Sequence, residues 1–102
     1  MTGSRSPESL TAADFRDIKG SRFRLESLEF EVADVIEAAA SPSATFRAPF
    51  SVLFHGPMEP ILPQAIYRLE HDEFGSIDLF LVPVGPDPSA GPAAMRYEAV
   101  FG

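Results

Sequence analysis

The apolar residues of this chain recur at every second position over most of its length. Such alternation is typical of strands that bury one face and expose the other. It predicts strands at residues 22–26, 28–36, 50–55, 66–71, 76–84 and 95–101. Because turn-forming residues and no long helical segments separate these runs, the strands should pair antiparallel. The pattern therefore predicts an all-β fold, a small six-stranded antiparallel barrel or sandwich with one short N-terminal helix.

The strand Phe50–His55 has the strongest strand character in the chain. A proline precedes it and a Gly-Pro pair follows it, so it is bounded at both ends. Its alternation directs Phe50 and Phe54 inward, and we expect Leu79 and Tyr97 from later strands to join them in the core.

The regular pattern breaks at three places. The alternation slips at Ala33-Asp34, which predicts a β-bulge. Residues 56–64 contain three prolines and should cover the domain in extended form, with Ile61 and Leu62 pinned inward. The Gly- and Pro-rich residues 85–94 predict a connection made of turns.

The helix is expected near the N-terminus, from Ala12 to Lys19. Thr11 can cap it, and Asp14 lies at the third helical position, where its carboxylate suits the helix dipole. Two turns are too few to be stable alone, so Phe15 and Ile18 must pack against the sheet. We interpret residues 1–9 as a flexible leader and residues 10–102 as a single β-domain.

Composition and charge narrow the classes of function. The chain has 102 residues, nine phenylalanines, no cysteine and a net charge of −7. The negative charge disfavours binding to nucleic acid and anionic membranes, and the missing cysteines exclude thiolate metal sites. With neither a signal sequence nor an apolar run long enough to span a membrane, we expect a soluble, cytoplasmic protein.

The run Glu70-His71-Asp72-Glu73, together with His55, is the grouping with most potential for metal binding or acid–base chemistry. Glu70 and His71 point to opposite faces of a strand, and the two following residues belong to a turn. We therefore interpret the run as a solvated strand end where His71 and Asp72 form local hydrogen bonds. No catalytic residue, metal or other cofactor is expected.

Two arginines, Arg22 and Arg24, share an outward face and could bind an anion. Glu26, Glu29 and Glu31 lie on neighbouring positions, and we expect them to pair with the arginines across strands.

An exposed apolar patch is the main candidate for an interaction site. If Leu79 and its alternate neighbours face the core, Phe80 and Val82 face outward, with Val100 on the corresponding face of the last strand. The alternative is that the helix folds over this patch and packs Phe15 and Ile18 on Phe80.

Five segments of the chain carry a resemblance to a known family. They are L-T-A-A-D-F, R-A-P-F-S-V-L-F-H-G-P, L-P-Q-A-I-Y-R-L-E-H, F-L-V-P-V-G-P-D and M-R-Y-E-A-V-F. Together they resemble a small bacterial family of unknown function, over Leu10 to Phe101, whose members are sometimes encoded near proteins with phage tail-collar domains. This chain has Ala65-Ile66 where the family pattern has a glycine. The resemblance implies no catalytic residues and favours an accessory role in a tail-like or surface assembly.

Our leading hypothesis is a non-enzymatic protein-interaction or structural accessory domain of a phage-tail-like or fibre assembly, which binds a protein partner or self-associates. The alternative is a β-barrel that binds a small ligand within its phenylalanine core. A metal-dependent enzyme using His55 and His71 is the third hypothesis.

Overall fold

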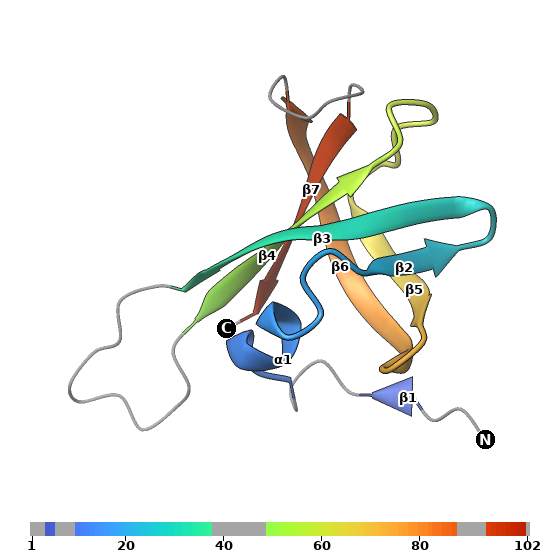
Figure 1. Ribbon diagram of the computed structural model, residues 1–102. Coiled ribbons are helices and arrows are strands. Elements are labelled where there is room, and N and C mark those ends of the chain that lie inside the picture. The colour runs from blue at the N-terminus through green and yellow to red at the C-terminus, as the bar shows by residue number, and fades with distance from the viewer. Residues whose placement is uncertain (1–3, 6–9, 38–48, 88–93, 102) are drawn as a thin grey trace.

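The computed structural model describes residues 4–5, 10–37, 49–87 and 94–101 (Figure 1). The elements are β1 Ser4–Arg5, α1 Ala12–Arg16, β2 Arg22–Leu25, β3 Leu28–Glu37, β4 Phe50–Gly56, β5 Ala65–His71, β6 Gly75–Asp87 and β7 Ala94–Phe101. No helix in these segments is both long and apolar enough to cross a membrane.

Strands β2 to β7 form a closed, barrel-like ring. Their order in the sheet is β6-β5-β2-β3-β4-β7, and a further pairing between β6 and β7 joins the two ends. Every pair within the ring is antiparallel, which confirms the predicted fold class. The short strand β1 adds to β6 in the parallel sense, so the predicted leader contains a two-residue strand. The remaining leader residues, 1–3 and 6–9, lie outside the described residues.

Irregular positions in the strands let the ring bend. The register between β3 and β4 shifts between Val32 and Asp34, which confirms the predicted bulge. The prediction of a turn-rich connection from residue 85 was wrong for its first part, because β6 continues to Asp87 in register with β7. Past Leu81 strand β6 no longer pairs with β5. Pro83 and Pro86 therefore lie on a stretch that pairs on only one edge among the described strands, where a missing backbone donor is tolerated.

The helix α1 is shorter than predicted, but its cap is confirmed. The Thr11 backbone N–H donates to Asp14 Oδ2 over 2.9 Å, and the Asp14 N–H donates to Thr11 Oγ1 over 3.3 Å. The Asp17 N–H still bonds four residues back, to the Ala13 carbonyl oxygen, whereas the N–H groups of Ile18 and Lys19 bond three residues back, as in turns. Gly20 then adopts a φ of 91°, which favours glycine, and its N–H donates to the carbonyl oxygen of Val32 on β3.

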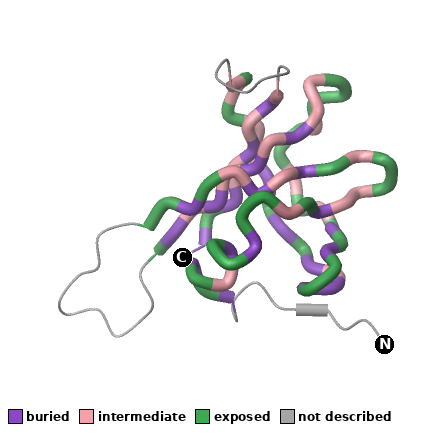
Figure 2. The backbone as a smooth tube through the Cα atoms, in the orientation of Figure 1, coloured by how far each residue is buried: buried purple, intermediate pink, exposed green. Residues whose placement is uncertain are grey.

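The interior of the ring is filled by the side chains of the buried core cluster. Figure 2 marks along the backbone which residues are buried. The predicted core residues Phe50, Phe54, Leu79 and Tyr97 are all buried. Within the irregular segment after β4, Leu62 is half-buried, and its N–H donates to the Tyr97 hydroxyl over 2.9 Å. The prediction that its neighbour Ile61 points inward was wrong, since that side chain is 49% exposed.

Truncation of Phe54 should remove a central part of this core. The ring is fully buried and packs edge-on against Phe23 at a centroid distance of 5.6 Å. We expect Phe54→Ala to lower the free energy of unfolding by about 3–5 kcal/mol in urea titrations, since the cavity cannot collapse fully. Ile61→Ala is the control and should change it by less than about 1 kcal/mol. Equal effects of the two substitutions would contradict this view of the core.

Candidate functional site

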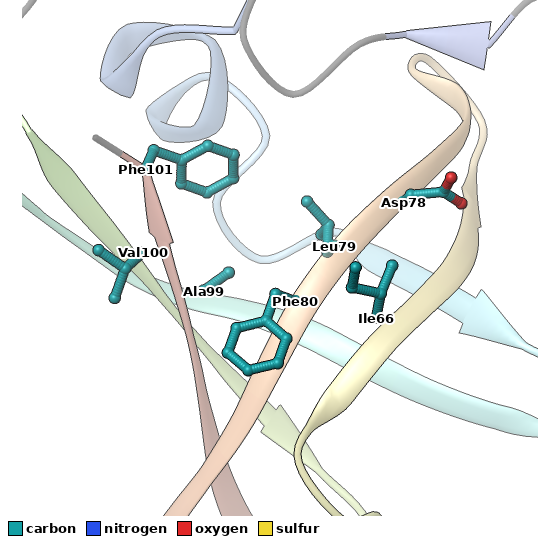
Figure 3. Close-up of a pocket in the computed structure, with 7 residues that line it drawn as sticks. All are labelled: Ile66, Asp78, Leu79, Phe80, Ala99, Val100 and Phe101. Carbon is teal, nitrogen blue, oxygen red and sulfur yellow. The ribbon is translucent and has the colours of Figure 1, made fainter.

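The ring opens between β6 and β7. Strand β6 pairs with β5 from Gly75 to Leu81, but its pairing with β7 begins only at Val82, opposite Glu98. Toward α1 the two strands diverge, as Figure 3 shows. We call the resulting opening the β6–β7 cleft. It has a volume of about 320 Å³ and is lined by Ile66, Asp78, Leu79, Phe80, Ala99, Val100 and Phe101.

The lining of the β6–β7 cleft is almost entirely apolar. Its floor consists of Leu79, Ala99 and Phe101, which are buried core residues. Its walls are exposed: Phe80 is 50% accessible to solvent, and Val100 is 65% accessible. Because strand neighbours alternate between faces, buried floor residues and exposed wall residues follow each other along β6 and β7.

Two of the three predicted interaction residues lie at this cleft. Phe80 and Val100 form its walls, whereas Val82 is half-buried, lies where β6 and β7 begin to pair, and does not line the cleft. The sequence reading missed Ile66, which lies directly opposite Phe80 on β5 and is 68% exposed. The register between β5 and β6 shows that Ile66 extends the patch.

The alternative in which the helix covers Phe80 was wrong. Phe15 of α1 instead packs inside the open end of the ring, 5.1 Å from Phe101 and 6.1 Å from Phe50 between ring centroids. Ile18 is also buried in the core cluster. The outer apolar patch therefore has no cover from α1.

An ion pair borders the apolar patch on the next outward positions. Arg68 of β5 donates two hydrogen bonds to Asp78 of β6, of 2.9 and 3.2 Å. These hydrogen bonds lower the pKa of the Asp78 carboxyl below its ordinary value. Asp78 therefore remains ionised and bound to Arg68, and it is the polar member of an otherwise apolar lining.

His71 is buried, which corrects our prediction of a solvated strand end. Only 4% of the residue is exposed, and its ring lies 4.6 Å from that of Phe23. The expected local hydrogen bonding is present, because the backbone N–H groups of Glu73 and Phe74 both donate to His71 Nδ1. Burial lowers the pKa of His71, partly offset by the nearby carboxylates of Glu73 and Asp72.

His71 also lies 2.8 Å from the hydroxyl of Ser21, measured from Nε2, but the pair is not arranged as a base and a nucleophile. Since Nδ1 accepts two hydrogen bonds, the ring proton belongs on Nε2, which donates to Ser21 Oγ. The Ser21 hydroxyl in turn donates to the Ile18 carbonyl oxygen. A nucleophilic serine needs the opposite direction of hydrogen bonding. This chain of bonds instead links the end of the helical region to the β5–β6 turn.

The remaining polar candidates have separate partners. His55 Nε2 lies 2.9 Å from Asp87 Oδ2 on the outer side of the sheet, so His55 and His71 do not converge. Arg22 pairs with Glu29 at 3.8 Å, as expected, whereas Arg24 pairs with Asp72 at 3.0 Å. No group of three or more His, Asp or Glu side chains suited to a metal ion occurs in the described part of the chain.

The buried His71 predicts a pH-dependent stability. Because its folded-state pKa lies below the ordinary value of about 6.5, the unfolded chain binds a proton first as the pH falls. Stability should therefore decrease from pH 7.5 to 5.5. His71→Asn keeps an acceptor for the two backbone N–H groups but cannot titrate, so its melting temperature should fall less over this range. Identical pH profiles would contradict a neutral buried His71.

Removing the Nδ1 acceptor of His71 should destabilise the folded domain more than His71→Asn does. His71→Ala leaves the N–H groups of Glu73 and Phe74 without their partner. We expect a loss of about 1–3 kcal/mol in the free energy of unfolding at pH 7.5, measured by urea titration. If His71→Asn were as destabilising as His71→Ala, the acceptor role of Nδ1 would be wrong.

Comparison with known proteins identifies a family. No curated protein and no solved structure matches the chain significantly. The family model described as a domain of unknown function, DUF6916, matches residues 10–101. This range spans the helix and all six strands of the ring, and it agrees with the resemblance seen in the sequence. The chain therefore belongs to this family of domains of unknown function.

Proposed function

We propose that the domain is a non-enzymatic protein-interaction module that binds a protein partner at the β6–β7 cleft. The observation that carries this proposal is the exposure of Phe80, Ile66 and Val100 around a cleft with a buried apolar floor. Exposed apolar groups of this size are typical of contact sites, and an aromatic side chain next to a cleft is the kind of anchor that dominates binding energy.

The electrostatics of the domain indicate what kind of partner surface fits. With a net charge of −7, the domain attracts basic surfaces and repels acidic ones. The polar residues that border the patch, Arg68 and Asp78, already neutralise each other. Contact through the cleft would therefore bury apolar area without leaving an unpaired charge.

The biological setting we propose is a structural or accessory role in a bacterial phage-tail-like or fibre assembly. This setting rests on the sequence resemblance described above. A small domain with an exposed apolar cleft and a filled core suits such a role, since assembly requires specific contacts and no chemistry.

Binding of a small ligand is the second candidate. A volume of about 320 Å³ lies at the lower end of the range for small-molecule sites. The ring interior is occupied by core side chains, so the ligand would have to bind in the cleft rather than inside the ring. Native mass spectrometry of the domain purified from its host would reveal a bound small molecule, which would favour this candidate over a protein partner.

The substitution Phe80→Asp tests the interaction site. On an exposed wall it should leave the melting temperature within a few degrees of the parent, while it abolishes self-association or capture of the partner from the native host. Ile61→Asp is a matched control, because Ile61 is 49% exposed and does not line the cleft. Loss of binding only in Phe80→Asp supports the proposal. Full retention of the partner by both folded variants would show that this site is not the contact.

A further inference from the structure

We infer that the partner enters the β6–β7 cleft as an extended segment and adds a strand to the free edge of β6. This inference rests on the proposed function and specifies the kind of partner: an extended peptide with apolar side chains at alternate positions. The evidence comes from the strand pairing, from β1 and from the two faces of the cleft.

The first observation is that, within the described part of the chain, one edge in the middle of β6 has no strand partner. On one edge, β6 pairs with β5 continuously from Gly75 to Leu81. On its other edge, β1 pairs only with Ser76 and Ile77, and β7 begins only at Val82. Among the described residues, positions 78–81 therefore have no strand partner on that edge. Backbone N–H and C=O groups on such an edge are a template for an added strand.

The second observation is that this edge already accepts a strand. Ser4 and Arg5 of β1 pair in parallel with Ser76 and Ile77, immediately before the free positions. The local twist and spacing of β6 are thus compatible with a neighbour on this side.

The third observation is that both faces of the incoming strand would meet apolar groups. Side chains directed inward would contact Leu79, Ala99 and Phe101 on the floor of the cleft. Side chains directed outward would lie beside Phe80 and Val100. Four paired residues span roughly 13 Å of strand. The cleft thus selects a short segment with apolar residues at every second position and without proline at the paired ones.

An extended segment suits this cleft better than a helix. A helix satisfies its own backbone hydrogen bonds and would leave the free edge of β6 unpaired. It is also about 10 Å wide with its side chains, whereas strands in a sheet lie about 4.8 Å apart. Only an extended segment uses the edge and the apolar lining together.

Selection from a library of random octapeptides displayed on yeast tests the inference. The complete 102-residue domain is the bait, and peptides that also bind Phe80→Asp are discarded, with Ile61→Asp as the positive control. We expect enriched peptides with apolar residues at positions i, i+2 and i+4. Their binding should slow amide hydrogen exchange at residues 78–81.

Backbone methylation separates strand addition from simple apolar contact. The best peptide is synthesised in two forms, each methylated at one of the two alternate sets of backbone nitrogens. Methylation of the set that faces β6 should weaken binding at least about tenfold, because it removes donors without changing any side chain. If methylation of neither set weakens binding, the peptide does not bind by strand addition and the inference is wrong.

Three other outcomes would also overturn the inference of strand addition. Enriched peptides with apolar residues at i, i+3 and i+4 would indicate a helical partner, and failure to enrich any peptide would contradict an open edge. A dimer of the free domain in sedimentation experiments that Phe80→Asp abolishes would assign the cleft to a second copy. In each of these cases the proposed function stands if Phe80→Asp still loses the native partner, so the two failures can be told apart.

Discussion

The ring of strands depends on Phe15, which closes the end at which the strands diverge. Its ring lies within 5.1 to 6.4 Å of four other phenylalanine rings, Phe23, Phe50, Phe74 and Phe101. These come from β2, β4, the β5–β6 turn and β7, so one side chain joins segments that are far apart in sequence. A helix of five residues has little stability of its own. The helix therefore forms because Phe15 is buried, and the end of the ring is closed because the helix presents Phe15.

At the same end of the ring, His71 satisfies buried backbone N–H groups of the β5–β6 turn. The β5–β6 turn must leave backbone N–H groups buried next to aromatic rings, where unpaired donors are costly. The neutral imidazole accepts from two of them through Nδ1 and donates through Nε2 to Ser21, just after the helical region. Phe74 can then enter the core beside Phe15. A residue that resembles half of a catalytic pair thus holds the turn in place, and its low pKa follows from that burial.

The location of the candidate site follows from how two strands change partners. β3 pairs with β2 near its start and with β4 to its end, and β6 similarly passes from β5 to β7. The helical region lies beside β3. Two ion pairs, Arg16–Glu37 and Lys19–Asp34, and backbone hydrogen bonds to Val32 hold it there. Beside β6 no described element plays that part beyond the two residues of β1. Among the described elements, the opening beside β3 is thus covered and the opening beside β6 is not, with Phe80 at the wall of the latter.

Local pattern predicted the strands, the bulge at Ala33-Asp34, the helix cap and the direction of Phe80 and Val100, because each depends on neighbours a few residues away. The cleft depends instead on the register between strands distant in sequence, and a slip of register between Pro83 and Gly85 is not visible in composition. Gly56 shows the same limit. The sequence indicates a strand end at this glycine, yet a Cβ there would lie 2.7 Å from the ring of Phe30, so tertiary packing requires it. His71 and Ile66 also have roles that come from long-range packing. Alternation places each of them on one face of its strand, but it does not reveal which residues they contact.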